Sequence, residues 1–343
     1  MTESLTERQK EVLKNVVQTF ILTAAPVGSR GLSKKSDLSL SPATIRNVMA
    51  DLEEEGYISH PHVSAGRIPT DKGYRFYVDG LMGIEMLSQK DKDGIYQNLS
   101  GIIETEDLLK EASKLLSRIS KQLSVVSTPH LRTGVLTQLE IIQISNSKLM
   151  AIMSIRSGLV KTITMEITFE ISRSKIEEIN RFLNERLCGL TLNEIRETFH
   201  DRVKDAENED TGLIRLFLCN TDKLFNDFYS RERLHISGTT NILSQPEFES
   251  PEHIKSIIEL IDNEDIIIHV LEKFEEKNKC DNVTIMIGSE NDIERLQDYS
   301  LIISSYRIGE TTGTIGIIGP TRMEYSKVIP IVSCVAEAVS SNN

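Results

Sequence analysis

The most constraining feature of the sequence is the segment from Ser41 to Gly56, which carries a start signal, one apolar face and a stop signal for a single helix. Ser41 is suited to accept a backbone N–H bond as the N-cap, and Pro42 stands at the first helical position, where its missing N–H costs nothing. Gly56 is a natural stop. Apolar residues recur at i, i+3, i+4 and i+7 and predict one buried face: Ile45, Val48, Met49 and Leu52.

The opposite face of this predicted helix is small and polar, which suits the major groove of DNA. Its first half offers Ser41, Thr44, Arg46 and Asn47 together with the positive end of the helix dipole, and Asn and Arg are the side chains that pair with adenine and guanine. Its last turns hold Asp51 and residues 53–55, which are three glutamates that phosphates would repel. We therefore expect the amino end of the helix to face DNA.

The segments around this helix predict the rest of a winged helix-turn-helix in residues 1–80. Thr6 with Gln9 predicts a capping box for a first amphipathic helix, and a short second helix is expected from Ser29 to about Lys35. After Gly56, residues 57–59 and 67–68 predict two short strands joined by a loop. Within this β-wing, we expect His62 and Arg67 to touch phosphate or the minor groove.

Charge is distributed unevenly along the chain. The chain holds 39 Lys and Arg against 51 Asp and Glu, a net charge of -12, which argues against a protein that coats nucleic acid through bulk charge. Residues 1–80 hold ten of each sign, with basic patches at residues 29–50 and 56–77 on either side of the acidic run. Arg30 and Lys34 in the first patch are expected phosphate contacts. The alternative is a small packing module with a solvated basic edge.

The remaining residues predict a body with both helices and strands. Strand-like runs at 134–169 and at 283–318 flank a mostly helical middle, so the simplest layout is one sheet interrupted by an inserted piece. The predicted fold class is therefore multidomain α/β (α+β). An apolar stripe predicts a helix from about Glu104, which is either ordinary core or a dimer seam: Leu108, Ala112, Leu115, Ile119 and Leu123.

Several other chemistries lack a signal in this sequence. The four cysteines, at 188, 219, 280 and 334, form no C-x-x-C and are expected to be buried thiols. His60 and His62 lack a third ligand for a metal, and the glycines at 309, 313, 316 and 319 lack the Gly-Lys-Ser/Thr of a phosphate cradle. We expect no cofactor, no metal and no enzyme activity. The N-terminus has no apolar leader and no apolar run is long enough for a membrane span, which predicts a cytoplasmic protein without a membrane partner.

Three runs of residues resemble HrcA, the family of bacterial heat-inducible transcription repressors: Pro26–Arg30, Ser41–Glu53 and Ser64–Asp79. A fourth run, Gly316–Met323, resembles the closing motif of the family. The resemblance therefore covers nearly the whole chain, and it is weakest between about 190 and 280.

The resemblance implies a homodimer that binds an inverted-repeat operator, the CIRCE element, upstream of chaperone genes, with the chaperonin GroEL modulating its activity. It also implies DNA contacts at Thr44, Arg46, Asn47 and Arg67. The implied domains are a winged helix-turn-helix at 1–80, a linker at 81–103, a GAF-like domain at 104–190 and 280–343, and an inserted dimerisation domain at 191–279. The principal alternative is a regulator with a small effector in the GAF-like cleft; an enzyme fused to a DNA-binding module ranks third.

Overall fold

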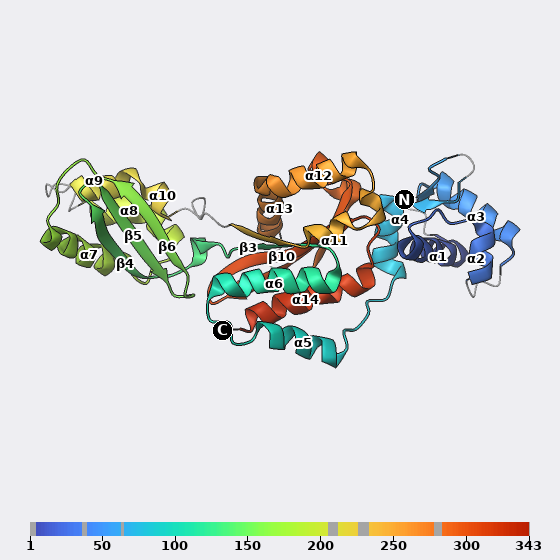
Figure 1. The fold of residues 1–343 in the computed structure, drawn as a ribbon, viewed down its shortest axis with the longest axis horizontal. Coiled ribbons are helices and arrows are strands. Elements are labelled where there is room, and N and C mark those ends of the chain that lie inside the picture. Colours follow the sequence, from blue (N-terminus) through green and yellow to red (C-terminus); the bar gives the residue numbers. More distant parts are fainter. Residues whose placement is uncertain are drawn as a thin grey trace.

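The computed structural model of the chain describes residues 5–35, 40–62, 65–204, 212–225, 233–277 and 283–342. Three units lie in a row along the longest axis of the molecule (Figure 1): a helical N-terminal unit, a central unit built on a five-stranded sheet, and a unit built on a three-stranded sheet. No helix in the described part of the chain has both the length and the apolar character that crossing a membrane requires.

The N-terminal unit contains three helices, a two-stranded hairpin and a fourth helix. Thr6 caps the first helix through the predicted capping box with Gln9. The hairpin is antiparallel, with Ile58 opposite Pro69. The fourth helix continues without a break into one π-helical turn. The elements are α1 (Glu7–Thr23), α2 (Ser29–Lys35), α3 (Pro42–Glu54), β1 (Ile58–Ser59), β2 (Ile68–Pro69), α4 (Asp71–Phe76) and η1 (Tyr77–Leu81).

The central unit is an antiparallel sheet in the order β7-β3-β10-β9-β8, covered on both faces by helices (Figure 1). One face packs against α6 (Thr105–Ser120) and α14 (Tyr325–Ser340), and α5 (Gln89–Leu99) packs against these two helices. The other packs against α11 (Thr239–Leu243), α12 (Pro251–Asp262) and α13 (Glu264–Lys277). The strands are β3 (Leu123–Ser127), β7 (Leu234–Ser237), β8 (Thr284–Ile287), β9 (Tyr299–Ile308) and β10 (Thr311–Pro320).

Helix α6 decides between the two interpretations of its apolar stripe. Leu108, Ala112 and Leu115 are all buried, and the helix packs against α14 and β3. Ile119 is 38% exposed, and Leu123 lies beyond the helix, in β3. The buried part of the stripe is therefore ordinary core within one chain.

The third unit is a meander, β4 (Leu136–Ser145), β5 (Lys148–Ile155) and β6 (Val160–Glu166), with helices on one face only (Figure 1). These helices are α7 (Arg173–Leu187), α8 (Leu192–Val203), α9 (Gly212–Cys219) and α10 (Thr221–Phe225). Two amides of α7 cover the free edge of β4: Asn184 bonds the N–H and C=O of Leu139 at 2.8 and 2.6 Å, and Asn180 bonds those of Ile141 at 2.8 and 3.2 Å. Side-chain amides thus replace a fourth strand.

The expectation that the strands at 134–169 and at 283–318 share one sheet is wrong, because β4–β6 form a separate three-stranded sheet in the part of the chain that the structure describes. Short connections favour pairing between strands that are neighbours in the sequence. In the central sheet, β3 instead pairs with β7, with Val125 opposite Ile236, although a long segment of the chain separates the two strands. The chain therefore leaves the central sheet after β3 and returns at β7. Residues 233–277, expected in the insertion at 191–279, belong to the central unit.

The expectation of buried thiols is correct only for Cys334. Cys188 is half-buried and Cys219 is exposed, while Cys280 lies outside the described residues.

Candidate nucleic-acid interface

Helix α3 is held by a cap at its start and by a buried face along its length. The Oγ of Ser41 accepts a hydrogen bond from the Thr44 N–H at 3.1 Å and lies 2.9 Å from the Thr44 hydroxyl. All four residues of the predicted apolar face are buried: Ile45, Val48, Met49 and Leu52. Because this face fixes the rotation of the helix, Arg46 and Asn47 are left exposed to solvent.

The amino end of α3 carries cations without partners. Arg30 and Lys34 on α2 are exposed, as is Arg46 on α3, and none of the three forms an ion pair with the residues that the structure describes. Helix α2 packs beside α3. Unpaired cations beside the positive end of a helix dipole are suited to bind an external polyanion. The turn predicted at 36–39 lies outside the described residues.

The carboxyl end of α3 is bonded to the hairpin. The Nη2 of Arg67 lies 2.6 Å from the Oε2 of Glu53, and His60 bonds the other oxygen of the same carboxylate. Burial raises the pKa of Glu53, but the bond from His60 and the charge of Arg67 outweigh it, so the pKa lies below the ordinary range. Glu55 accepts a bond from Gln9 of α1 at 2.9 Å.

Arg67 is therefore engaged inside the unit, although we expected it to reach outward to DNA. Its side chain is 27% exposed, and its backbone pairs with Val27 through bonds of 2.8 and 2.9 Å. His62 is exposed on the hairpin loop, of which residues 63–64 lie outside the described residues.

The basic patch predicted at 56–77 is likewise not a free surface. The Nζ of Lys72 donates to the Glu55 carbonyl at 2.7 Å and lies 4.1 Å from the centroid of the Tyr57 ring. Arg75 pairs with Glu290 of the central unit. The two predicted basic patches thus differ: the first is open, and each cation of the second has an internal partner.

Sequence reasoning missed the part that Glu53 plays. In the sequence this glutamate indicates only a charge that repels phosphate, whereas in the structure it joins α3 to His60 and Arg67. Its partners lie seven and fourteen residues away, across a turn and a hairpin, so no helical or strand periodicity connects them.

The glycines considered as a phosphate cradle have a packing role in β10. A Cβ at Gly316 would lie 2.6 Å from the Ile302 carbonyl oxygen, and one at Gly313 would lie 2.5 Å from the Tyr306 hydroxyl. Across the described ranges, no three His, Cys, Asp or Glu side chains gather as a metal site would require.

Comparison with known proteins gives one consistent result. Residues 106–329 match the family model described as the HrcA protein C-terminal domain. A heat-inducible transcription repressor HrcA from Chlorobium phaeobacteroides (strain BS1) is 39% identical over 348 residues, with 99% of each chain covered. The corresponding repressor from Chlorobaculum parvum is 41% identical over 355 residues, again with 99% of each covered. Both names describe transcription repressors and not enzymes, as expected from the sequence.

A solved structure described only as a hypothetical protein resembles the whole fold. It aligns with a TM-score of 0.61 and 25% sequence identity, covering 99% of this chain and 100% of the other.

Proposed function

Since the chain belongs to the HrcA family of heat-inducible transcription repressors, we propose that it represses heat-shock genes by inserting the amino end of α3 into the major groove of operator DNA. The observation that carries this proposal is the contrast along one helix. Exposed cations without ion-pair partners among the described residues lie on α2 beside it and in its first half, whereas its acidic carboxyl end is bonded into the unit. Only the first of these ends offers free donors to a polyanion.

In this proposal the N-terminal unit works as a winged helix-turn-helix. Thr44, Arg46 and Asn47 read base edges, because they lie on the first turns of α3 and a recognition helix enters the groove by its N-terminal residues. Arg30, Lys34 and Ser41 contact phosphates, and His62 contacts the backbone from the wing. For Arg67, contact with the minor groove requires the guanidinium to exchange Glu53 for DNA.

We propose further that the protein binds an inverted repeat, the CIRCE element, as a homodimer, because two units related by a dyad match a palindromic site. The second copy is proposed to cover the helix-free face of the β4–β6 sheet. On this face Ile142 of β4 stands opposite Met150 of β5, and Ile152 is the next residue of β5 on the same face. Ile142 is 38% exposed and Val160 is 60% exposed.

The domain assignment follows the same layout. Residues 105–127 and 233–342 form the proposed GAF-like domain, and residues 134–225 form the proposed dimerising insertion. The chaperonin GroEL enters as a partner through the family resemblance, and repression takes place in the cytoplasm on nucleoid DNA.

Enrichment of genomic DNA tests the proposal. The purified protein is mixed with fragments of the genome of its own organism, and the bound fragments are sequenced. We expect inverted repeats upstream of chaperone genes, retained by Glu259→Gln, which removes an exposed charge on α12, and lost by Asn47→Ala. Enrichment of arbitrary sequence, equal for the two variants, would contradict the proposal. Adding GroEL to the same mixture tests whether the chaperonin increases the yield.

One observation favours the alternative of a small-molecule effector. A cleft of 520 Å³ opens between the end of β9, α5 and α14, lined by Tyr96, Ser304, Arg307, Ser333 and Glu337 among others. A metabolite that raised the melting temperature saturably and also changed operator affinity would support this alternative. A screen without any such compound would remove it.

A further inference from the structure

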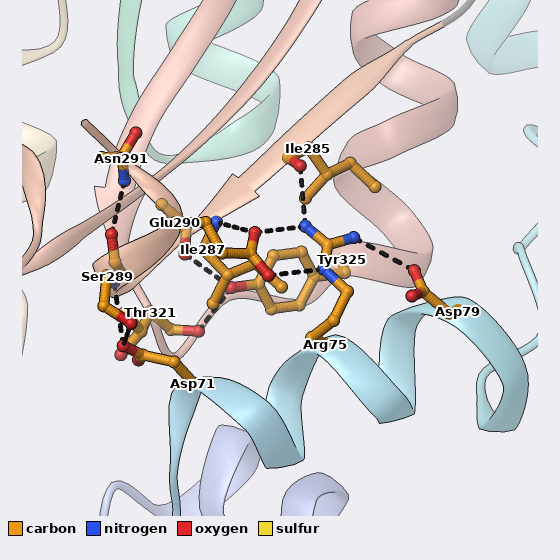
Figure 2. Close-up of polar contacts among 12 residues, drawn as sticks. Asp71, Arg75, Asp79, Ile285, Ile287, Ser289, Glu290, Asn291, Thr321 and Tyr325 are labelled. Atoms are coloured by element: carbon orange, nitrogen blue, oxygen red, sulfur yellow. Dashed lines mark hydrogen bonds and ion pairs between the residues drawn. The ribbon is translucent and has the colours of Figure 1, made fainter. Parts of the chain in front are cut away.

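Two of the sequence motifs that carry the family resemblance have no part in reading DNA as proposed above. These are the end of the run Ser64–Asp79, which forms α4, and the run Gly316–Met323, which ends β10. In the structure α4 lies against the edge of the central sheet (Figure 2), beside the start of α14. The contacts there join the N-terminal unit to the central unit.

Arg75 of α4 makes the most extensive of these contacts. Its Nε and Nη2 donate to the two oxygens of Glu290 at 2.7 and 2.5 Å, and its Nη2 also donates to the Ile285 carbonyl at 2.7 Å. Asp79, one turn further along the helix, accepts from Nη1 at 3.0 Å. The Ile287 N–H donates to Glu290 at 2.8 Å. Both partners of this bidentate pair are thus oriented by further bonds, which adds geometric specificity.

A second contact lies one turn earlier on the same helix. Asp71 accepts bonds from the N–H and the hydroxyl of Ser289 at 2.9 and 2.8 Å. The loop that presents Ser289 and Glu290 is held by the buried amide of Asn291, which donates to the Gly288 and Leu296 carbonyls at 2.8 and 3.1 Å. Internal hydrogen bonds therefore fix the conformation of this loop, and α4 is bonded to it at two points.

The closing motif supplies a third contact. The Nη1 of Arg322 donates to the Ile21 carbonyl of α1 at 2.6 Å, and its Nε and Nη2 donate to the two oxygens of Glu247 at 2.5 and 3.1 Å. The rings of Tyr74 on α4 and Tyr325 on α14 lie 6.2 Å apart, and Tyr74 is 2% exposed. Three separated contacts fix the orientation of the N-terminal unit relative to the central unit, whereas a single contact would allow the two units to rotate.

Helix α4 is also attached rigidly to the carboxyl end of α3. A Cβ at Gly73 would lie 2.0 Å from the Tyr57 carbonyl oxygen, so only glycine permits this approach. The Thr70 hydroxyl donates to the Gly56 carbonyl at 2.7 Å, and Lys72 donates to the Glu55 carbonyl. Helix α4 therefore connects the edge of the central sheet rigidly to α3, the helix that we assign to DNA.

From this geometry we propose that Asp71, Arg75 and Glu290 are positioning residues, which hold each reading helix at one orientation to the body so that a dimer accepts one spacing between half-sites. The proposal rests on the proposed function, because spacing has meaning only for a dimer on DNA. None of the three residues is assigned to DNA. Their effect passes through α4 to α3.

Selection from a pool of duplexes with randomised inverted half-sites and variable spacers tests the proposal. The parent protein is expected to enrich one spacer length. Glu290→Gln and Asp71→Asn are expected to enrich several lengths and to lose about tenfold affinity at the parental spacing, with unchanged affinity for a single half-site. Glu259→Gln is the matched control, since it removes the same charge from α12 and is expected to behave as the parent. A folded Glu290→Gln that keeps the parental preference, or binds the parental spacing more tightly, would overturn the proposal.

Hydrogen exchange without DNA separates failure of this proposal from failure of the proposed function. In the parent, amides at 71–81 and 287–291 are expected to exchange slowly, and Glu290→Gln is expected to accelerate both segments while leaving α3 protected. Fast exchange of both segments in the parent would overturn the proposal even if the protein binds DNA. A parent that enriches no duplex, with slow exchange in both segments, would overturn the assignment to DNA and with it the role in spacing.

Discussion

The two ends of α3 carry similar numbers of nearby cations and use them differently. At the amino end, Arg30, Lys34 and Arg46 are exposed without a partner among the described residues. Beyond the carboxyl end, Arg67, Lys72 and Arg75 each bond an acceptor of the same chain. A count of charges along the sequence gives both segments the same sign. The two groups differ in the positions of nearby acceptors, which leave the first group available to an external anion and bind the second group within the chain.

Gly73→Ala should give the largest effect, because it breaks the joint at the carboxyl end. The added Cβ would lie 2.0 Å from the Tyr57 carbonyl oxygen, and overpacking of this kind costs about 3 kcal/mol. The free energy of opening residues 42–76, measured by hydrogen exchange, should fall by that amount. Gly80→Ala on the following turn is the control, since nothing lies within 4 Å of its added Cβ. Equal free energies of opening for the two variants would contradict the close packing of α4 on Tyr57.

Asn47→Ala should give the next largest effect, confined to the amino end. Loss of a base-reading amide should cost about 1 to 3 kcal/mol on the cognate site, relax base preference and leave stability unchanged. Titration of cognate and random duplexes measures it. Glu54→Ala, exposed at the other end of the same helix, should not weaken binding. A larger loss for Glu54→Ala than for Asn47→Ala would reverse the orientation proposed for α3.

The ion pair at the carboxyl end predicts a dependence of stability on pH. The pKa of Glu53 is lowered in the folded chain, so its contribution is present above the ordinary carboxyl range and disappears as pH falls through the lowered pKa. The effect should be at most about 1 kcal/mol, as for other partly exposed pairs. Unfolding of the N-terminal unit followed between pH 6 and pH 3 should show about this loss. Glu53→Gln should lack it, and an unchanged profile in that variant would assign the acid sensitivity to other groups.

Lys34→Ala should give the smallest effect. Removal of one phosphate contact should weaken binding to every duplex by about twofold to fivefold and reduce the salt slope by about one. Affinities measured at several salt concentrations on cognate and random DNA give both numbers. A loss restricted to the cognate site would identify Lys34 as a base contact.

Much of the N-terminal unit was predictable because its signals are local. Ser41, Pro42 and the four apolar residues of α3 define that helix within one short window, and the structure places the helix there. The sheets were predicted less well, since β3 joins the central sheet through partners far along the chain. For the same reason the acceptors of Arg67 and Arg75 could not be predicted: Glu290 lies 215 residues from Arg75. Local patterns identify charged side chains, whereas tertiary pairing decides which of them remain free.

Photocrosslinking from the two ends of α3 tests the central claim most directly. A benzophenone side chain is introduced at Ala43 or at Glu54, both of which are exposed and outside the apolar face, and each protein is irradiated on the duplex that the parent enriches. We predict crosslinks to bases of the half-site from position 43 and none from position 54. Crosslinks from position 54 alone would contradict the account.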